Sequence, residues 1–340
     1  MRPSSTLYIS SAQCSLGELT ESAASAIQAG RLDADTAAQD GYLELPVSDR
    51  LAAPEMAVTA AHKALKAANL TPTRLGLLVH AWTYHQGHDF WSPAHFVARE
   101  LGASNALALG VQQMCNGGAV GIEAAAAWLC ANPELDNALI TTADRFAEPG
   151  FDRWCADYGI AYGDGATALT LSRQPGPFQV LACRSVCVPE LEDMHRGNDA
   201  FSTTPRWHSP NIDIRRTKEA FLAQDGRNRF ATAAATAMRK LMSGILADAN
   251  LTPDDPSLTL IALPRLGATV LNKAYRPLLA SICPTPTIDY GRQTGHLGAG
   301  DTAANLATLQ ATKTLTPGQT AILLSAGGGF SWTGLIIQAR

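Results

Sequence analysis

The sequence lacks an excess of positive charge: 26 Lys and Arg residues stand against 30 Asp and Glu residues, which leaves a formal net charge of −4. Proteins that bind nucleic acid usually carry a basic excess, so this balance argues against nucleic acid as a partner. The chain also has no apolar run approaching the roughly 20 residues that a membrane-spanning helix requires. Its first residues, MRPSSTLYISSAQCSLGE, include no apolar stretch typical of a signal peptide. We therefore expect a cytoplasmic protein with no membrane partner.

Cysteine pairs of the kind that hold zinc are missing as well. The seven cysteines are scattered singly, none forms a CxxC pair, and Cys183 with Cys187 has no second pair of ligand spacing. Four histidines fall within HAWTYHQGHDFWSPAH (80–95), but this stretch supplies few carboxylates and no HExxH pattern. We expect no metal site, and a loop so rich in His, Trp and Tyr is more typical of a substrate pocket or a subunit interface.

What the sequence does contain is an alternation of short β-rich runs with long alanine-rich segments. Strands are predicted at 75–84, 106–113, 137–146, 166–173, 258–266 and 320–328. Helices are predicted at 54–70, 117–131, 229–251 and 301–315. Several of the strands are almost continuously apolar, as strands covered on both faces are. The alternation predicts an α/β fold with layers of helix and sheet.

The two halves of the chain show similar sequence patterns. Each half closes with a glycine turn and a strand, YGDGATALTLSR in the first and SAGGGFSWTGLIIQAR in the second. Each also contains a strand followed at once by a small-residue helix, at 106–131 and 285–315. We predict a duplicated core divided near RQPGPFQ (173–179) into residues 1–175 and 176–340, with no long linker between them.

Cys115 differs from the other cysteines in its surroundings. It lies between the apolar strand ALALGVQQ and a helix predicted to begin near Asn116. A thiol at that junction faces the unpaired N–H groups and the positive end of the helix dipole, both of which favour the nucleophilic thiolate. We therefore interpret Cys115 as a nucleophile, with a buried core cysteine as the alternative. An α/β-hydrolase is not favoured, because QMCNG lacks the first glycine of GxSxG and His296 precedes Asp301.

The stretch TGHLGAGD (294–301) places His296 five residues before Asp301. Residues five apart do not share a helix face, so the two side chains meet only if the intervening LGAG is not helical. Gly298 and Gly300 allow the positive φ values that would turn the chain back. Asp301 could then hydrogen-bond one ring nitrogen and leave the other as a base, or it could cap the helix that follows. The sequence alone leaves both roles open.

Two glycine-rich stretches are candidates for other parts of a site. AGGGF (326–330) supplies backbone N–H groups near a strand end, as an oxyanion hole requires, although glycine triplets also occur in ordinary turns. YGDGATA (162–168) is typical of a turn before a strand, with Asp164 bonded to nearby backbone. The first stretch is therefore a candidate for catalytic support, and the second is predicted to be structural.

Together these landmarks resemble β-ketoacyl-acyl-carrier-protein synthase III and its thiolase-fold relatives. The resemblance covers nearly the whole chain and is carried by the strand–Cys–helix at Cys115, YGDGATALTL, SLTLIALP, the region around TGHLGAGD, and AGGGFSWTGLII. It implies a thiolase fold, in which two similar halves form five α-β-α-β-α layers, and a homodimer. It also implies that Cys115 takes an acyl group from a thioester, and that Gly328 and the N–H of Cys115 form the oxyanion hole.

Two positions depart from the condensing enzymes of that family, which use Cys, His and Asn. Their histidine lies in a PHQAN-like segment, where LPRLGA here puts Arg265, and their asparagine lies in a GNTSAA-like segment, where GHLGAGD puts His296. Condensation needs two neutral donors to stabilise the enolate formed when malonyl loses carbon dioxide. A single histidine oriented by a carboxylate instead suits deprotonation of an alcohol or amine. The pattern Cys115, His296 and Asp301 thus resembles the ketosynthase III-like acyltransferases of natural-product biosynthesis, which esterify hydroxyls, commonly on deoxysugars.

The resemblance therefore implies transfer of a short acyl group, malonyl-type groups included, through Cys115 to a hydroxyl of a natural-product acceptor such as a deoxysugar. The donor substrate would be acyl-coenzyme A or an acyl-carrier protein, and no cofactor is expected to be bound permanently. One alternative is a decarboxylative β-ketoacyl synthase, which would release carbon dioxide from a malonyl thioester. The other is a non-catalytic subunit of a heterodimeric synthase, which no thioester would acylate.

Arginines outside these motifs are candidates for substrate contacts. If the donor carries a free carboxylate, Arg145 and Arg153 in DRFAEPGFDRW are candidates to bind it, with surface ion pairs as the alternative. The polar segment 189–228 shows little periodicity, which is typical of a stretch that covers a site or an interface. Its basic residues are candidates to dock an acidic carrier protein or coenzyme A phosphates, with a solvated face as the alternative: Arg196, Arg206, Arg215, Arg216 and Lys218.

Overall fold

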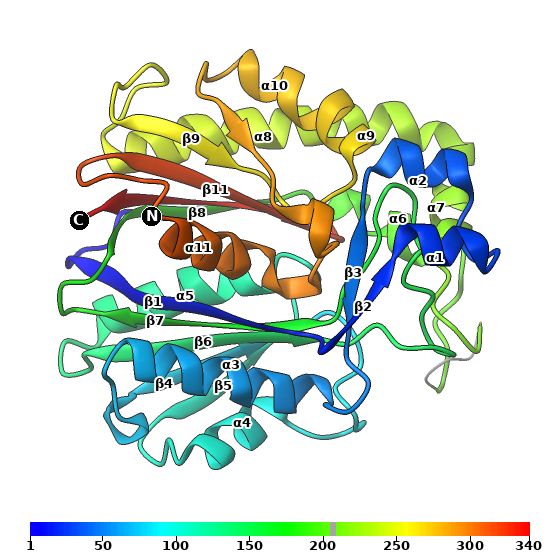
Figure 1. The fold of residues 1–340 in the computed structure, drawn as a ribbon. Helices are drawn as coiled ribbons and strands as arrows, with labels where there is room; N and C mark the ends of the chain where they lie inside the picture. Colours follow the sequence, from blue (N-terminus) through cyan, green and yellow to red (C-terminus); the bar gives the residue numbers. More distant parts are fainter. Residues whose placement is uncertain (205–208) are drawn as a thin grey trace.

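The computed structural model describes residues 1–204 and 209–340. Within them, layers of helix and layers of sheet alternate from one side of the molecule to the other (Figure 1). The helices of these layers are α8 (Arg227–Ala249) and α10 (Arg276–Ala280) outside one sheet layer, α5 (Gly117–Ala131) and α11 (Asp301–Thr312) between the sheet layers, and α3 (Ala53–Ala67) and α4 (Pro93–Leu101) outside the other. The predicted α/β fold with an α-β-α-β-α layer order is confirmed.

The described strands form a ten-stranded sheet, which makes up both sheet layers, and a separate two-stranded sheet. In order across the large sheet, the strands are β10 (Thr287–Ile288), β9 (Leu258–Ala262), β11 (Thr320–Gly327), β12 (Ser331–Ala339), β8 (Phe178–Cys187), β1 (Leu7–Leu16), β7 (Gly165–Ser172), β6 (Asn137–Asp144), β4 (Leu77–Ala81) and β5 (Leu107–Val111). The small sheet pairs β2 (Leu19–Ser22) with β3 (Glu44–Val47). Among the described strands, the pairing that links the two layers is that of residues 7–9 of β1 with residues 178–180 of β8.

Shorter elements complete the described chain. The remaining helices are α1 (Ala23–Gln28), α2 (Ala34–Asp40), α6 (Asp193–Arg196), α7 (Ile214–Phe221) and α9 (Ala268–Val270). Single turns of 3₁₀ helix lie at Pro72–Arg74, Pro189–Leu191, Gly291–Gln293 and Gly298–Gly300, and π-helical turns lie at Leu222–Gly226 and Leu271–Tyr275. Helices α1, α2, α6 and α7 lie with the small sheet at one end of the layers (Figure 1).

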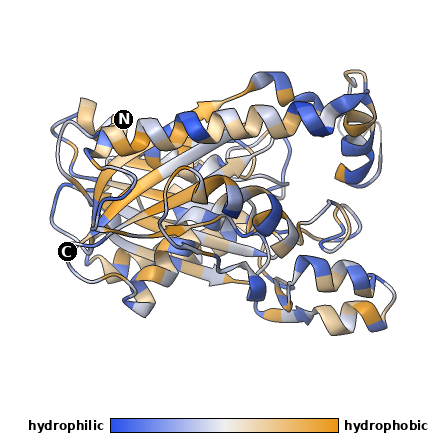
Figure 2. Ribbon diagram, turned by 90° about the horizontal axis from the view of Figure 1, so that it is seen from above, coloured by the Kyte–Doolittle hydropathy of each residue, from blue (hydrophilic) through white to orange (hydrophobic). Residues whose placement is uncertain are grey.

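The elements predicted from the sequence are confirmed, with ends shifted by a few residues. The six predicted strands are β4, β5, β6, β7, β9 and β11, and the four predicted helices are α3, α5, α8 and α11. Strands β6 and β7 are buried along their whole length, as their continuous apolar runs imply. Hydrophobic residues are concentrated on the inner strands, and hydrophilic residues lie mainly on the outer helices and loops (Figure 2). No helix of the described residues is both long and apolar enough to cross a membrane.

The predicted boundary between the halves, at 173–179, falls in the connection from β7 to β8. The division into residues 1–175 and 176–340 is compatible with this position. The equivalence of the two halves stays a prediction.

Close packing in the middle layer brings the start of α5 against the turn that precedes α11. A methyl group at Gly118 would lie 2.2 Å from the carbonyl oxygen of Ala299, and one at Gly121 would lie 3.2 Å from Cγ1 of Val79. Only glycine fits at the first of these positions without moving the backbone. The two regions that the sequence singled out, around Cys115 and around 296–301, therefore lie together.

Candidate active site

Cys115 lies on the sharp turn between β5 and α5, as the sequence predicted. The preceding residue, Met114, has a φ of +49°, a left-handed conformation that is unusual for a residue with a side chain. Helix α5 begins two residues after the thiol, at Gly117. Cys115 is half-buried and lines a cavity of about 250 Å³. A nucleophile at a strained turn, facing a cavity, is the arrangement that covalent catalysis uses.

The turn at Cys115 is held against the end of β11 and the start of β12. The buried amide of Asn116 donates hydrogen bonds to Oγ of Ser331 at 3.0 Å and to Oγ1 of Thr333 at 2.8 Å. A methyl group at Gly327 would lie 2.6 Å from the backbone nitrogen of Asn116. The glycine triplet 327–329 is therefore fixed beside the nucleophile, where its N–H groups could serve an oxyanion.

His296 and Asp301 meet as the sequence suggested. Nδ1 of His296 lies 2.7 Å from Oδ2 of Asp301, and both side chains are buried. Gly298 has a φ of +57°, which turns the chain back, whereas Gly300 has an ordinary φ of −89°. The prediction of a left-handed glycine is therefore right for Gly298 and wrong for Gly300.

The alternative role of Asp301, as the cap of the following helix, is wrong. The residue before α11 is Gly300, and Asp301 is already the first helical residue, so its carboxylate turns away from the helix N–H groups. One oxygen accepts the N–H of Leu297 at 2.9 Å, and the other accepts the N–H of Arg265 at 2.7 Å. These bonds aim the carboxylate at the imidazole of His296.

The electrostatics of this pair are set by its buried partners. Burial by itself would lower the pKa of His296, but the negative charges of Asp301 and of a Cys115 thiolate outweigh it and raise the pKa well above its usual value. Burial would raise the pKa of Asp301, yet His296 and Arg265 hold it below the usual value. The ring lines the same cavity as Cys115, and with Nδ1 on Asp301 its Nε2 atom is the nitrogen left to face the thiol or a bound substrate.

A second imidazole, from His195, lines the cavity and was not predicted. Burial, with a smaller effect of the Lys218 charge, lowers the pKa of His195 to about 4. Its ring packs against Gly328, where a methyl group would lie 2.7 Å from Cε1, and against the ring of Phe330. The only signal in the sequence was its place in the irregular segment 189–228, which was predicted to cover a site.

The rest of the cavity is mainly apolar and aromatic. Its walls come from five parts of the chain: the 157–162 turn, the 194–218 region, α8, the 266–279 segment and the 326–332 strand end. The polar group among them is the ion pair between Lys218 and buried Asp157, whose other oxygen accepts the hydroxyl of Tyr162. Tyr162 in turn packs edge-on against the ring of His296, at 5.3 Å between centroids. Tyr162 therefore packs against the imidazole that Asp301 holds at Nδ1.

Asp144 is another residue that the sequence did not reveal. Its buried carboxylate accepts the N–H groups of Thr83, Tyr84 and Ala299, at 2.7 to 3.0 Å. Burial raises its pKa to about 7 in spite of these bonds. A methyl group at Gly298 would lie 2.1 Å from its Oδ2 atom. Asp144 therefore supports the turn that brings His296 to Asp301.

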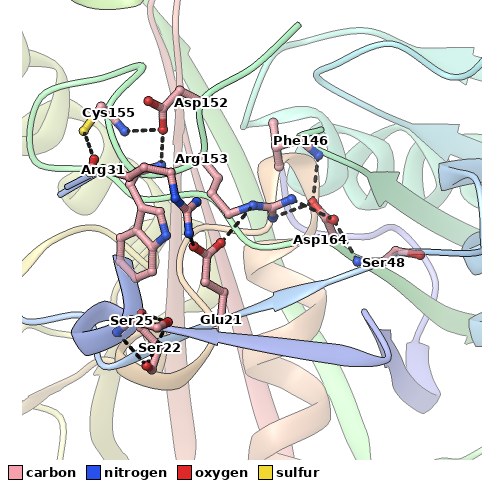
Figure 3. A network of polar contacts seen from close by, with 11 residues as sticks. Glu21, Ser22, Ser25, Arg31, Ser48, Phe146, Asp152, Arg153, Cys155 and Asp164 are labelled. Atoms are coloured by element: carbon pink, nitrogen blue, oxygen red, sulfur yellow. Dashed lines mark hydrogen bonds and ion pairs between the residues drawn. The ribbon is translucent and has the colours of Figure 1, made fainter. Parts of the chain in front are cut away.

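Of the two roles that the sequence left open for Arg153, the structure shows the ion pair. Its guanidinium donates to both oxygens of buried Asp164, at 3.1 and 3.3 Å, and lies 3.7 Å from Glu21 (Figure 3). Asp164 also accepts the N–H groups of Ser48 and Phe146 (Figure 3). It therefore bonds to backbone as predicted, but to backbone of other segments and not of its own turn. Arg153 does not line the cavity, because this ion pair holds it elsewhere.

Arg145 is the other candidate to bind a substrate carboxylate. Its guanidinium donates to the carbonyl oxygen of Asp49 at 3.3 Å, and it lines a separate pocket with Tyr84 and Glu148. It is not among the residues that line the Cys115 cavity. Lys218 is the single Lys or Arg among the described lining residues, and it is already paired with Asp157.

The arginines predicted to dock a donor are placed differently from one another. Arg206 lies outside the described residues. Arg216 forms a two-point ion pair with Asp199, and Arg215 bonds the carbonyl oxygen of Asp157 and stacks on the ring of Tyr158 at 5.1 Å. A docking role for Arg215 and Arg216 stays a prediction.

The histidine-rich loop holds no group of three metal-binding side chains, and neither does any other part of the described chain. His80 is buried in β4, where Oγ1 of Thr141 and Oε1 of Gln86 lie within hydrogen-bond distance of its ring, and burial lowers its pKa to about 4. None of the histidines in 80–95 lines the Cys115 cavity. The predicted pocket-lining role of this loop is therefore wrong for that cavity.

Two family models match the chain. One is 3-oxoacyl-[acyl-carrier-protein] synthase III, over residues 109–185, and the other is the C-terminal part of the same synthase, over residues 246–339. The β-ketoacyl-[acyl-carrier-protein] synthase III of Rhizorhabdus wittichii is 25% identical over 286 residues, which are 83% of this chain and 83% of that protein. The matched regions include both Cys115 and the 296–301 turn.

Solved structures of related enzymes are also similar to this chain. The acyltransferase ChlB3 superposes with a TM-score of 0.90 and is 31% identical, over 98% of both chains. The 3-oxoacyl-[acyl-carrier-protein] synthase III from Aquifex aeolicus superposes with a TM-score of 0.79 at 19% identity, over 98% of this chain and 99% of that one. The second similarity concerns the fold, whereas the first extends to the sequence.

Proposed function

The chain belongs to the 3-oxoacyl-[acyl-carrier-protein] synthase III family, and from this premise we propose that it is an acyltransferase. It moves an acyl group from a coenzyme A or carrier-protein thioester, through an acyl-enzyme on Cys115, to a hydroxyl of an acceptor. A deoxysugar on a natural product is the proposed acceptor class. The similarity to ChlB3, an acyltransferase, supports this choice over condensation.

One observation carries the proposal: the cavity contains an imidazole paired with a carboxylate, in place of two neutral donors. Arg265, at the position of the family's condensing histidine, sends its guanidinium to Asn305 and Thr294, away from the cavity. An enolate formed by decarboxylation would therefore lack the donor that this position supplies in the condensing enzymes. A carboxylate-oriented histidine is the group that removes a proton from a hydroxyl.

In the first step, the Cys115 thiolate attacks the carbonyl carbon of the thioester. The N–H groups of Cys115 and Gly328 are proposed to bind the resulting oxyanion. When the intermediate collapses, the carbon–sulfur bond to the carrier breaks. The departing thiolate takes the proton from the His296 imidazolium, which leaves an acyl group on Cys115 and a neutral ring.

In the second step, the acceptor hydroxyl attacks the acyl-enzyme and gives its proton to Nε2 of His296. Acylation has by then removed the negative charge of Cys115, one of the two charges that raise the pKa of His296. The pKa of the ring therefore falls toward its usual value, and the ring becomes free to accept a proton near neutral pH. Collapse of the second intermediate releases the ester and restores the Cys115 thiolate.

The apolar cavity also narrows the choice of acyl group. Neither Arg145 nor Arg153 reaches the cavity, and Lys218 is engaged by Asp157. A malonyl carboxylate would therefore have no free cation there, and its burial would be costly. We propose an uncharged acyl group in place of the malonyl type.

A homodimer is part of the proposal. Strand β5 ends the large sheet, so one side of its backbone is unpaired in this chain, and Leu107 on it is 49% exposed. Open edges of this kind pair with another strand unless they are protected. Light scattering after size-exclusion chromatography should give twice the chain mass, and a monomer at micromolar concentration would contradict this part.

The test of the proposed function begins with acylation. Wild-type protein is mixed with hexanoyl-coenzyme A or malonyl-coenzyme A, and its intact mass is measured. We expect a hexanoyl adduct that Cys115→Ala abolishes and that Cys187→Ala, which removes an exposed thiol, retains. Acylation of Cys115→Ala to the wild-type level would overturn the proposal, and a chain that no thioester acylates would indicate a non-catalytic subunit.

The second step, transfer of the acyl group to an acceptor hydroxyl, is tested on the isolated hexanoyl-enzyme. A panel of methyl 6-deoxyglycosides is added, and ester formation is followed by mass spectrometry. We expect loss of the adduct together with formation of a hexanoyl ester. Carbon dioxide release and a β-keto product on addition of malonyl-carrier protein, without ester formation, would show a condensing enzyme instead.

A further inference from the structure

Arg265 is a buried cation beside the catalytic pair, at the position where the family's condensing enzymes have histidine. Only 3% of the residue is exposed. Its guanidinium donates to Oδ1 of Asn305 at 3.0 Å, to Oγ1 of Thr294 at 2.8 Å and to Oγ1 of Thr308 at 3.4 Å. Every one of these partners is a neutral oxygen, so the hydrogen bonds fix the side chain without neutralising it.

The backbone of Arg265 is held equally firmly. Its N–H donates to Oδ2 of Asp301 at 2.7 Å, the same oxygen that Nδ1 of His296 contacts. Its carbonyl oxygen accepts the hydroxyl of Tyr42, and a methyl group at Gly291 would come within 3.0 Å of its Cβ atom. One residue therefore donates from its backbone to the carboxylate and also buries a positive charge, held by neutral partners, in the same part of the core.

A buried cation is costly unless an opposite charge offsets it. Burial lowers the pKa of Arg265, and the charge of Asp301 is the largest opposing influence. Reciprocally, Arg265 is among the groups that keep the pKa of Asp301 low, after His296. Asp301 is thus the main negative charge that offsets the burial of Arg265. Arg265 is, after His296, the main positive charge that offsets the burial of Asp301.

We propose that Arg265 is a positioning residue of the acyl transfer: it holds Asp301 ionised and aimed at His296. The role of Arg265 in acyl transfer rests on the proposed function. Its effect on the ionisation of Asp301 does not. A histidine at this position would donate to substrate from its ring. Arginine turns its side chain out of the cavity and acts through the carboxylate instead.

Other titratable groups surround the pair and are part of its electrostatics. Those whose charge or ring faces Asp301, His296 or Arg265 from neighbouring elements are Cys14, Tyr42, Cys115, Asp144, Tyr162, Tyr275 and Tyr290. All of these groups are acids or tyrosines, whereas Arg265 stays positive at every pH of interest, since a guanidinium keeps its proton. Its removal should therefore raise the affinity of the whole pair for protons.

The test compares Arg265→Gln, which removes the charge, with Arg265→Lys, which keeps it. Protein with ¹⁵N-labelled histidine is titrated by NMR, and the His296 signals are assigned with His296→Gln. We expect the apparent pKa of the His296–Asp301 pair to rise by about one unit in Arg265→Gln. In Arg265→Lys it should stay within a few tenths of a unit of the wild-type value.

Arg184→Gln is the matched control, because Arg184 makes an equally complete two-point bond to Asp248 far from the pair. It should leave the titration of His296 unchanged. An unchanged titration in folded Arg265→Gln, judged by circular dichroism, would overturn the proposal. So would an equal shift in Arg265→Lys, which would point to geometry alone.

The catalytic arm measures loss of the hexanoyl adduct in the presence of the methyl 6-deoxyglycosides, from pH 5 to 9. The acidic limb of this profile should move to higher pH in Arg265→Gln, while the level of Cys115 acylation at completion stays unchanged. A lower plateau with an unmoved limb would show a merely structural role and overturn the proposal. If wild type forms no ester, the proposed function fails while the NMR result still decides the role of Arg265.

Discussion

Two imidazoles face the same cavity, and their surroundings give them opposite properties. His296 is the more deeply buried, yet a carboxylate at 2.7 Å and the Cys115 charge raise its pKa well above the usual value. His195 has no such partner, and burial lowers its pKa to about 4. The contact with Asp301 and the charge of Cys115 together outweigh the effect of burial, and they separate a proton-carrying ring from a neutral one.

The largest expected effect comes from removing the carboxylate that distinguishes the two rings. Asp301→Asn should lower the pKa of His296 toward that of His195, because burial then acts with less opposition. Transfer from the acyl-enzyme should fall on the order of 10³- to 10⁴-fold, as when a histidine base loses its orienting carboxylate. Single-turnover ester formation measures the rate. Asp289→Asn, which alters a surface ion pair with Arg276, is the control, and equal rates in wild type and Asp301→Asn would show that His296 is not the base.

The turn that joins His296 to Asp301 offers the next test. Gly298→Ala places a methyl group 2.1 Å from Oδ2 of Asp144 at a φ of +57°, whereas Gly102→Ala has a φ of +71° and open space around it. We expect a loss of about 3 kcal/mol in unfolding free energy for the first and about 1 kcal/mol for the second. Urea denaturation measures both. Similar losses of unfolding free energy in the two variants would mean that the Asp144 side chain moves aside at little cost.

The two rings should also show opposite pH dependence of stability. The folded pKa of His296 lies above the usual 6.5, and that of Asp301 lies below the usual 3.8. Their pairing therefore stabilises the folded state fully between pH 3.8 and pH 6.5, the two usual pKa values. The stabilisation, on the order of 2 kcal/mol, is lost as pH rises through the raised pKa of His296. For His195, the folded pKa of about 4 lies below 6.5, so its contribution is present above pH 6.5 and is lost as pH falls toward 4.

Urea denaturation of His296→Gln and His195→Gln between pH 4.5 and 8 measures these contributions. The difference from wild type should shrink with rising pH for His296→Gln and grow for His195→Gln. Parallel curves for the two variants would contradict the comparison.

The smallest expected effect concerns the wall formed by His195. Gly328→Ala puts a methyl group 2.7 Å from the His195 ring, which can move only if its packing on Phe330 changes. We expect acylation of Cys115 by hexanoyl-coenzyme A to slow about tenfold, through displacement of the proposed oxyanion donor. The double variant Gly328→Ala/His195→Ala should recover most of the rate. No recovery would mean that the backbone at 328 itself is disturbed.

The sequence predicted the parts of the site that depend on local pattern. The junction at Cys115 follows from an apolar run ending before a helix, and the contact between His296 and Asp301 follows from glycines that interrupt a helical spacing. His195 was missed because only the tertiary contact with Gly328 brings it to the cavity. For Arg153 the sequence left carboxylate binding and an ion pair open, because only the folded chain shows that Asp164 is its partner. Charge and position along the chain do not show which carboxylate an arginine will meet.

Helix α8 contributes Phe230, Ala234 and Met238 to the cavity, spaced four residues apart on one face. Cys115 and His296 come from other elements, the turn before α5 and the turn before α11. One wall of the cavity is therefore encoded in a different stretch of the gene from the two proposed reacting groups. A library confined to the three α8 positions could retune which acyl donors are accepted, with the chemical machinery inherited unchanged.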